Sequence, residues 1–541
     1  MLQIRRILIL VAAGLAFPSA LVALPVAVAH ASSTQEASFQ DNRLLLDNPA
    51  RLPQTMQTLK LLGVQRLRIS VVWDQIAPSA NSRKAPKRFA ASNPAAYPAA
   101  NWAPFDRIVT AAAKYGMGVN FDVMGGAPLW AVGGRAPAAN MAHVWYPSAS
   151  AFGSFVAAVG TRYSGRYKPR GASTFLPRVS YWSIWNEPNV GTSSLSPQTV
   201  NGIEVGPRVF RGLANAAWAS LLRTGHRPGP DTILVGELAS TGHADPGATL
   251  GMQPLRFLRA LYCVGSNYKQ LRGAAAAARG CPTTASASRK FRGANPILFN
   301  ATGWSHHPYH LTTAPNVVSP PADPDWVTMA DLPRLERALD RIQGVYGSRK
   351  KFPIYLTEYG FDTDPPQVGN AVTLATQAAY LNQAEYIAWK DPRVQTLDQY
   401  LLQDTASVQS IYSAFASGLI FANGAPKPAF DAYRLPLWLP ATAAPRGRPL
   451  EVWGCIRPSH FTIPNTRQAQ TAQIQFQPGS SGPFMLFGTV TIKSAKSCYF
   501  DVYLRFPESG TVRVAYTYPP GDPSLPAGAT AYSRGIRVTL S

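Results

Sequence analysis

The chain of 541 residues predicts an α/β fold: a (β/α)8 TIM barrel followed by a small all-β sandwich domain. From about residue 38 to residue 440, short apolar runs alternate with amphipathic stretches, as a repeated strand–helix unit requires. That part of the chain is long enough for a barrel, which takes about 250 residues. Beyond residue 449 the apolar residues instead follow a period of two, which is typical of antiparallel strands.

Eight candidate strands alternate with helices in the first part of the chain. Each strand is a short apolar run that ends at turn-forming residues. We expect strands at Ala37–Gln40, Arg66–Val72, Gly118–Met124, Ser180–Trp185, Thr232–Leu238, Gly303–His307, Ile354–Thr357 and Thr396–Leu402. We expect helices at Pro53–Leu62, Trp102–Tyr115, Ala149–Tyr163, Gly206–Arg223, Pro254–Tyr262, Asp331–Tyr346 and Thr373–Lys390. Eight strands are the number that closes such a barrel.

The C-terminal part is expected to form a separate domain. Residues 441–449 are rich in Pro, Arg and Ala and predict a linker, which places the barrel domain at residues 32–440 and a β-sandwich at residues 450–541. Its strands are expected at Glu451–Ile456, Ala472–Phe476, Met485–Ile492, Tyr499–Phe506, Thr511–Tyr518 and Gly535–Leu540. No binding motif is evident there, so the domain either binds glycan or stabilises the barrel.

The N-terminal residues have the pattern of an export signal. A basic start precedes an apolar run from Ile7 to about Ala29, and Ala29-His30-Ala31 has the small-x-small pattern of a signal-peptidase site. We therefore expect residues 1–31 to be a signal peptide and the protein to be secreted or held at the cell surface. The run is also long enough to span a bilayer, so an uncleaved anchor is the alternative.

The four cysteines are consistent with export. An even number of cysteines in an exported chain indicates disulfides. We expect Cys263 to pair with Cys281 and Cys455 with Cys498, because each bridge would then lie within one domain.

The chain is strongly basic, with 51 Lys and Arg against 28 Asp and Glu and a formal net charge of +23. Such an excess is compatible with electrostatic association with an anionic cell-surface polymer. The alternative is a solvated, Arg-rich surface without a specific partner. No basic run has the pattern of a nucleic-acid motif, so nucleic acid is not an expected partner.

Two glutamates stand where a parallel barrel places its chemistry. Glu187 follows the run at 181–185 and Glu358 follows the run at 353–356, and turn-forming residues come directly after each. Active sites of such barrels lie at the C-terminal ends of the strands. Two carboxylates from distant strands can break a glycosidic bond, one as the acid and the other as the nucleophile. The apolar sequence neighbours of Glu187 favour it as the acid.

Several polar residues are candidates to support these carboxylates. Glu358, as nucleophile, needs positive charge and hydrogen-bond donors, and Arg68 in the second expected strand offers a fixed fork of donors. His307 and Tyr309 follow the sixth strand and offer further hydrogen bonds. Asn186 precedes Glu187 and could reach the 2-hydroxyl of a sugar.

Aromatic residues are plentiful, with 12 Trp and 22 Tyr. Sugar-binding clefts use flat aromatic faces with polar edges. We expect Trp73 and Trp130 to contact substrate in this way, and the alternative is that they are core residues.

The sequence indicates no cofactor. The histidines at 306–310 suggest a metal, but no acidic ligand lies near them in the sequence, so we expect none. Walker and Rossmann glycine patterns after a strand are absent, and the absence of Gly-x-Ser-x-Gly disfavours a serine esterase.

As a set, these motifs resemble the retaining glycoside hydrolases of clan A, a large (β/α)8 group that includes families 5 and 39. The likeness covers about residues 38–437 and is specific as a set, although no single motif is. The matching motifs are Arg68, Trp73-x-x-Ile76-x-Pro78, Asn186-Glu187-Pro188, His307-Pro308-Tyr309, Thr357-Glu358-Tyr359-Gly360, Gly418-Leu419 and Gly424–Ala429.

The resemblance implies that Glu187 is the acid/base, that Glu358 is the nucleophile and that Arg68 and Asn186 position the substrate. One segment departs from the family. Many members carry a Trp at the end of strand eight as the floor of the −1 sugar site, whereas this chain has Gln399-Tyr400-Leu401-Leu402-Gln403-Asp404. Tyr400 or Gln403 is the candidate replacement.

The residues and the resemblance together predict a secreted retaining β-glycosidase that acts on a polysaccharide or glycoconjugate, with carbohydrate as its substrate. A transglycosylase on the same barrel is one alternative, since a sugar hydroxyl could replace water in the second step. A catalytically silent glycan-binding protein is the other. Such a binder would usually have lost one carboxylate, and this chain has both.

Overall fold

The computed structural model describes residue 32 and residues 34–405, 415–522 and 525–541. The expected signal peptide at residues 1–31 therefore lies outside the described residues. Within the described part of the chain, no helix combines the length and the apolarity that crossing a membrane requires.

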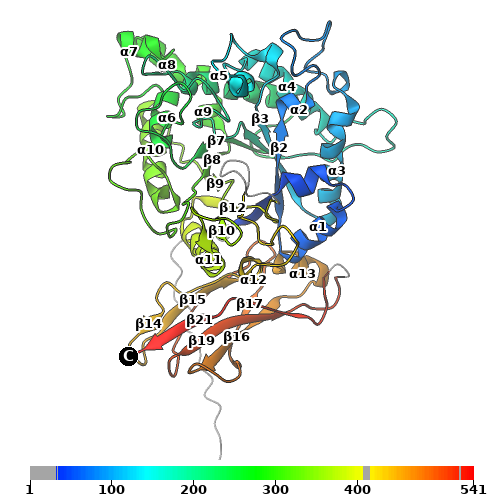
Figure 1. The fold of residues 1–541 in the computed structure, drawn as a ribbon, viewed down its shortest axis with the longest axis vertical. Coiled ribbons are helices and arrows are strands. Elements are labelled where there is room, and N and C mark those ends of the chain that lie inside the picture. The colour runs from blue at the N-terminus through cyan, green and yellow to red at the C-terminus, as the bar shows by residue number, and fades with distance from the viewer. Residues whose placement is uncertain (1–31, 33, 406–414, 523–524) are drawn as a thin grey trace, which may run out of the picture.

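A closed barrel of eight parallel strands forms the larger part of the molecule (Figure 1), and the predicted barrel is confirmed. The strands run around the barrel in the order β1-β12-β9-β8-β7-β4-β3-β2. Their bounds are β1 (Glu36–Gln40), β2 (Arg66–Val72), β3 (Gly118–Met124), β4 (Tyr181–Ile184), β7 (Thr232–Ala239), β8 (Gly303–His307), β9 (Ile354–Leu356) and β12 (Val394–Tyr400). Each one lies at a predicted position.

Alternation along the strands sends apolar side chains outward and polar ones inward. In β2, Leu67, Ile69 and Val71 are fully buried in the main hydrophobic core. Arg68 and Ser70 lie on the opposite face of the strand, because successive side chains of a strand point to opposite sides. The inner face of the barrel therefore carries polar and charged groups at the level of the site.

All seven predicted helices are present around the barrel (Figure 1). They are α1 (Leu52–Leu61), α3 (Ala99–Tyr115), α4 (Ala149–Arg162), α5 (Gly206–Arg223), α6 (Pro254–Leu261), α10 (Leu332–Val345) and α11 (Leu374–Lys390). The largest difference from the prediction is the start of α3, at Ala99 instead of Trp102.

Shorter elements lie in the connections and were not predicted. They are α2 (Trp73–Ile76), β5 (Thr199–Val200), β6 (Ile203–Glu204), α7 (Gly273–Ala278), α8 (Ala285–Ala294), α9 (Ile297–Asn300), β10 (Thr363–Asp364), β11 (Val372–Thr373) and α12 (Pro428–Arg434). The Cys263–Cys281 disulfide joins the end of α6 to the segment after α7, as predicted.

Two further sheets follow the barrel, and both contribute side chains to one second hydrophobic core. One sheet contains β13 (Leu437–Trp438), β15 (Leu450–Cys455) and β18 (Tyr499–Leu504). The other contains β14 (Ala443–Ala444), β16 (Gln470–Pro478), β17 (Met485–Ile492), β19 (Gly510–Thr517), β20 (Thr530–Tyr532) and β21 (Ile536–Leu540). The predicted Cys455–Cys498 disulfide is also present. Helix α13 (Ser459–Thr466) was not predicted, and β14 lies inside the stretch expected to be a linker.

The two C-terminal sheets pack against the end of the barrel where the strands begin. The hydroxyl of Tyr518 donates to the carbonyl of Leu61, at the end of α1, and Arg457 pairs with Glu385 of α11 at 2.5 Å. Tyr499 donates to Gln35, directly before β1. The carboxyl ends of the barrel strands therefore face away from the C-terminal sheets.

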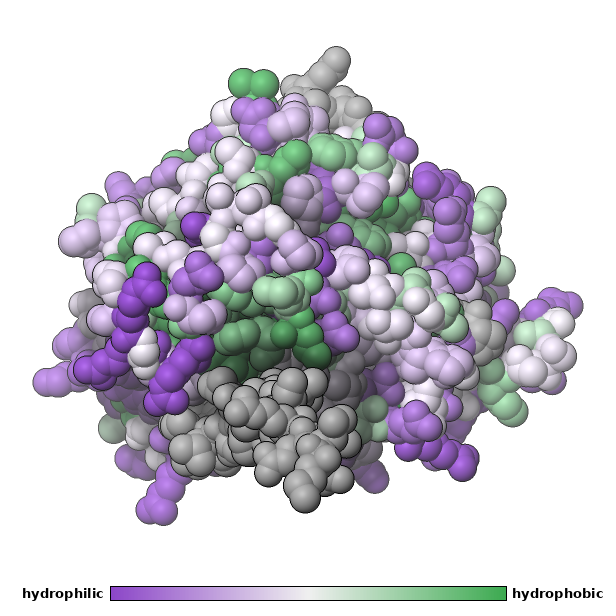
Figure 2. Space-filling view, turned by 90° about the horizontal axis from the view of Figure 1, so that it is seen from below, coloured by the Kyte–Doolittle hydropathy of each residue, from purple (hydrophilic) through white to green (hydrophobic). Residues whose placement is uncertain are grey.

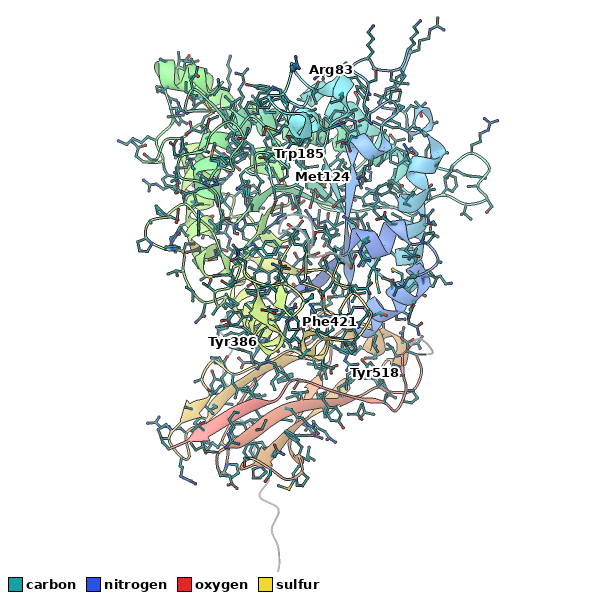
Figure 3. The ribbon with its side chains drawn as sticks, in the orientation of Figure 1. Arg83, Met124, Trp185, Tyr386, Phe421 and Tyr518 are labelled. Atoms are coloured by element: carbon teal, nitrogen blue, oxygen red, sulfur yellow. A yellow bond between two sulfur atoms is a disulfide. The ribbon has the colours of Figure 1, made fainter. Side chains whose placement is uncertain are left out.

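The figures agree with this arrangement. Tyr386 and Tyr518 lie next to the C-terminal sheets in Figure 3, whereas Met124 and Trp185, at the carboxyl ends of β3 and β4, lie well above them. The end that carries the sheets has a mixed surface of polar and weakly polar residues with a green apolar area near its centre (Figure 2).

Candidate active site

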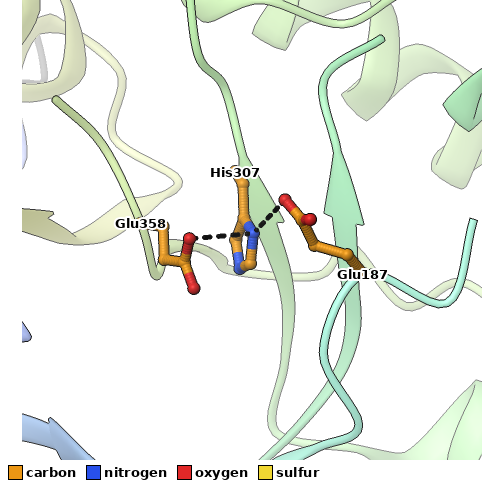
Figure 4. A group of neighbouring side chains, drawn as sticks. All are labelled: Glu187, His307 and Glu358. Atoms are coloured by element: carbon orange, nitrogen blue, oxygen red, sulfur yellow. Dashed lines mark hydrogen bonds and ion pairs between the residues drawn. The ribbon is translucent and has the colours of Figure 1, made fainter. Parts of the chain in front are cut away.

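Glu187 and Glu358 meet at the carboxyl end of the barrel. Glu187 follows β4, Glu358 follows β9, and His307 is the last residue of β8 between them (Figure 4). One carboxylate oxygen of each glutamate and one ring nitrogen of His307 all lie within 4.8 Å of one another. Residues 171 positions apart in the chain (358 − 187) thus converge at one site.

Arg68 lies beneath these carboxylates, with its side chain fully buried. Its guanidinium donates to Glu358 at 2.6 Å, to the side-chain oxygen of Asn186 at 2.9 Å and to Glu237 at 2.9 Å. Burial disfavours its charge, but the surrounding acidic groups, of which Asp122 has the largest effect, raise the pKa of Arg68 above its ordinary value. Arg68 therefore remains a cation that orients Glu358 and Asn186.

His307 lies between three carboxylates and is itself fully buried. Its Nδ1 is 3.0 Å from Glu187 and 3.7 Å from Glu358, and its Nε2 is 2.8 Å from Glu237. Burial alone would lower the pKa of the imidazole, but Glu358, Glu187 and Glu237 outweigh it and raise the pKa to about 10. At neutral pH the ring is an imidazolium that donates to Glu187 and Glu237.

Tyr309 completes the support of Glu358. Its hydroxyl donates to the carboxylate at 3.3 Å, and its ring stacks on Tyr359. Burial and the charge of Glu358 raise the pKa of Tyr309, so the phenol keeps its proton and remains a donor. Arg68, His307 and Tyr309 thus surround Glu358 with two cations and a neutral donor.

Tyr400 and Gln403, the two candidates to replace the Trp that many family members carry at the end of strand eight, have different surroundings. Burial raises the pKa of Tyr400, and the charges of Glu358 and Glu187 add to that effect, which places its hydroxyl in the field of the site. The amide of Gln403 instead donates to the carbonyls of Ala422 and Phe421 and supports the loop. Tyr400 is therefore the residue of this segment whose hydroxyl is affected by the charges of the two carboxylates.

Glu237, near the end of β7, is a member of the site that the sequence analysis missed. Its fully buried carboxylate accepts hydrogen bonds from Arg68, His307 and Thr357. Burial opposes its charge, but Arg68 and His307 lower the pKa of Glu237 well below its usual range. The available signal was an acidic residue inside the apolar run Thr232–Ala239, since an isolated buried carboxylate needs a partner.

Three residues of the site have left-handed backbone conformations. The φ angles are +66° at Trp185, +44° at Glu187 and +49° at Glu237. Such conformations cost on the order of 1–3 kcal/mol each for residues other than glycine and persist where the surroundings impose them. The amide of Glu187 also donates to the carbonyl of Glu237 at 2.9 Å, which fixes the two strained positions to each other.

The expectation that Trp73 contacts substrate is wrong. Trp73 is fully buried, stacks on Phe155 and meets Trp130 edge-on, so it is a core residue of the helical layer. Trp130 is partly buried, and its indole N–H donates to the carbonyl of Pro78 at 3.1 Å. No contact joins Trp130 to the carboxylates among the described residues, and its role in binding stays a prediction.

Glu187, His307 and Glu358 converge, so they also offer atoms that could ligate a metal. A histidine binds a metal through an unprotonated ring nitrogen. In His307 both nitrogens face carboxylates, and the pKa is raised to about 10. A metal at this position would have to displace the proton that His307 shares with Glu187 and Glu237.

Several solved structures resemble the chain at low similarity. A family 39 glycoside hydrolase from Bacteroides cellulosilyticus is 13% identical with a TM-score of 0.45, over 88% of this chain and 81% of that chain. A glucosidase from Croceicoccus marinus is 12% identical with a TM-score of 0.45, over 88% and 94%. A family 1 β-glucosidase from Thermotoga maritima is 11% identical with a TM-score of 0.44, over 75% and 97%.

No protein-family model matches the chain, and no curated protein sequence matches it.

Proposed function

We propose that the protein is a retaining β-glycosidase that hydrolyses O-glycosidic bonds of a polysaccharide or glycoconjugate through a covalent glycosyl-enzyme intermediate. The observation that carries this proposal is the separation of Glu187 and Glu358, whose nearest oxygens lie within 4.8 Å. Retaining enzymes keep their carboxyl groups about 5–5.5 Å apart, whereas inverting enzymes need about 6.5–9.5 Å to admit a water.

The surroundings of each carboxylate support its role. Glu358 is held by Arg68, Tyr309 and His307, which favours an anion that attacks the anomeric carbon. Among the described residues Glu187 contacts no arginine, and its one cationic neighbour is His307 at 3.0 Å. Its side chain is the more exposed of the two, 26% against 12%, as suits a group that exchanges protons with the leaving group and with water.

The reaction proceeds in two steps. The carboxylate of Glu358 forms a bond to the anomeric carbon as the glycosidic C–O bond breaks, and Glu187 gives its proton to the departing oxygen. Water then attacks the same carbon, Glu187 takes a proton from that water, and Glu358 leaves as a carboxylate. Arg68 keeps Asn186 in place, where its amide can reach the 2-hydroxyl of the sugar.

Secretion belongs to the same proposal. The two disulfides support an oxidising environment outside the cytosol. The N-terminal pattern at residues 1–31 provides the export signal. The position of the C-terminal sheets, at the barrel end opposite the carboxylates, supports a stabilising role for them.

The direct test is turnover of a panel of aryl β-glycosides and cell-wall polysaccharides by the wild type and by Glu358→Gln. We expect at least one aryl glycoside to be cleaved, and Glu358→Gln to lose that activity while its circular dichroism and melting temperature remain near those of the wild type. Glu508→Gln, at an exposed position in the bend between β18 and β19, is the matched control and should keep full activity. No turnover on any substrate, with sugar binding retained, would favour the silent glycan-binding protein instead.

A further inference from the structure

A groove opens beside the carboxylates, between the segments that follow β7 and β8. Its volume is about 510 Å³, within the range of about 300–1,000 Å³ typical of small-molecule sites. Its walls include Tyr309, Leu311, Val317, Val318, Pro320 and Trp326. We call it the β8 groove.

The β8 groove is apolar although its walls are exposed. Leu311 is 68% exposed, Val318 61% and Val317 46%, and all three belong to the loop after β8. Exposed apolar side chains that gather in one hollow, instead of being scattered singly, mark a binding surface. The loop therefore leaves uncovered a surface that an apolar ligand would bury.

The described residues that line the groove include no Lys, Arg, Asp or Glu, in a chain whose net charge is +23. Its one histidine, His310, is neutral at physiological pH because burial lowers its pKa to about 4. An anionic polymer or a charged sugar finds no partner there. Hydroxyl groups also line the groove, at Thr241, Thr312, Thr313, Ser319 and Thr328, but most of its lining surface is apolar, so the walls suit a neutral and mainly apolar group.

Tyr309 joins the groove to the carboxylates. The residue lines the groove, and its hydroxyl donates to Glu358 at 3.3 Å. A molecule whose sugar lies over Glu187 and Glu358 can therefore extend past Tyr309 into the groove. Hydroxyl-rich sugar units would lose hydrogen bonds to water against Leu311, Val317 and Val318, whereas an alkyl chain would gain by burial.

We propose that the β8 groove is the binding site for an alkyl aglycone, so that the preferred substrates are glycosides of long-chain alcohols. This inference rests on the proposed glycosidase function and specifies its substrate class. Flexible aliphatic chains suit these walls, because the branched aliphatic residues Leu311, Val317 and Val318 are exposed there.

The test uses n-alkyl β-glycosides, from methyl to octyl, of whichever sugar the aryl panel identifies. Each methylene buried in the groove should raise kcat/KM by roughly two- to four-fold, until the groove is filled. The methyl glycoside does not reach the groove, so its kcat/KM gives the activity of the carboxylate site alone. If kcat/KM is independent of chain length, the proposal is wrong.

Val318→Asp is the informative variant, because the side chain is exposed and its replacement leaves the core intact. It should flatten the dependence on chain length and leave the rate on the methyl glycoside unchanged. Leu486→Asp, at a 62% exposed position of β17, is the matched control and should retain the wild-type dependence. Equal dependence on chain length in Val318→Asp and the wild type would overturn the proposal.

A second measurement separates this inference from the glycosidase proposal. Calorimetric titration with 1-octanol requires no turnover. We expect the wild type and Leu486→Asp to bind octanol. Val318→Asp should bind it roughly ten-fold or more weakly, since a charge in an apolar wall is costly. Octanol binding without any glycoside turnover would retain the groove and reject the glycosidase function. Failure of octanol to bind would reject the alkyl site. If light scattering shows that the wild type is a dimer and Val318→Asp a monomer, the alkyl site is also rejected, and the groove is assigned to a second copy of the chain.

Discussion

His307 donates from Nε2 to the carboxylate of Glu237 at 2.8 Å, and neither side chain is accessible to solvent. This pair connects the parts of the site. Glu237 also accepts from Arg68, which holds Glu358, and His307 also contacts Glu187. The two candidate catalytic carboxylates, Glu187 and Glu358, therefore take their positions from a buried acid that does not need to touch the substrate.

Replacing Glu237 with Gln should lower kcat/KM by about 100-fold, because small displacements of positioned groups cost about that much. The change leaves Arg68 and His307 without one of their anions, so we also expect the free energy of unfolding to fall by about 3–5 kcal/mol. Steady-state kinetics and urea unfolding measure the two effects. A purely structural role would lower stability but leave kcat/KM and its pH profile unchanged in the folded variant.

The control for that variant is Glu204→Gln. Glu204 is also largely buried and pairs with Arg256 and Arg279 at 2.8 and 2.6 Å. Its loss should lower stability without affecting catalysis. Equal losses of activity in both variants would mean that activity follows stability rather than the position of Glu237.

His307 should make stability decrease at alkaline pH. A histidine titrates near about 6.5 in an unfolded chain, and its pKa is raised to about 10 in the folded protein. Between these values the folded state holds one more proton than the unfolded state, so the free energy of unfolding falls as pH rises. The contribution is fully present below pH 6.5 and lost as pH passes 10.

Urea unfolding at pH 7 and pH 9.5 of the wild type and of His307→Gln measures this contribution. The wild type should lose more stability over that interval than the variant, and other alkaline titrations cancel in the comparison. Identical pH dependence in the two proteins would show that His307 is not protonated in the folded state.

Replacing Glu187 with Gln should affect substrates according to their leaving groups. Glycosides of alcohols need a proton on the departing oxygen, so kcat/KM should fall by roughly 10²–10⁴-fold. A 2,4-dinitrophenyl glycoside needs no proton in the first step, so a burst of phenolate should precede slow turnover, because water lacks its base in the second step. Stopped-flow absorbance resolves the burst. Equal losses on both substrates would remove Glu187 from the acid/base role.

The Cys455–Cys498 disulfide should matter for stability and not for catalysis. It closes a loop of 43 residues, and a loop of that length corresponds to about 4 kcal/mol in the chain-entropy estimate. Replacing both cysteines with Ala should lower the free energy of unfolding by about 2–4 kcal/mol. Activity at 25 °C should not change, since the C-terminal sheets lie at the opposite end of the barrel from Glu187. A loss of kcat in the folded variant would contradict that separation.

The barrel strands and the two catalytic candidates could be predicted from the sequence for one physical reason. A strand buried in a barrel is a short apolar run, and the carboxyl end of that run is where polar residues such as Glu187 and Glu358 can reach the site. Arg68 followed from the needs of Glu358, since an ionised nucleophile requires positive charge and donors, and Arg68 lies on the second expected strand.

Glu237 could not be placed in this way. It lies within its apolar run, and the pairing of β7 with β8 shifts register between Gly236 and Leu238. Such a bulge re-aims one side chain, and this one directs Glu237 to Arg68. The prediction that Trp73 contacts substrate was wrong for a related reason. The direction of its side chain depends on packing with Phe155 from a distant helix, which no local pattern encodes.

The central claim is a covalent bond between Glu358 and the sugar. The most direct measurement is intact-protein mass spectrometry after reaction with an activated 2-deoxy-2-fluoro glycoside of the sugar that the aryl panel selects. We expect the mass to increase by one fluorosugar, peptide mapping to place it on Glu358, and Glu358→Gln to remain unlabelled. Turnover of the parent glycoside with no adduct, or an adduct on Glu187 instead, would contradict the account.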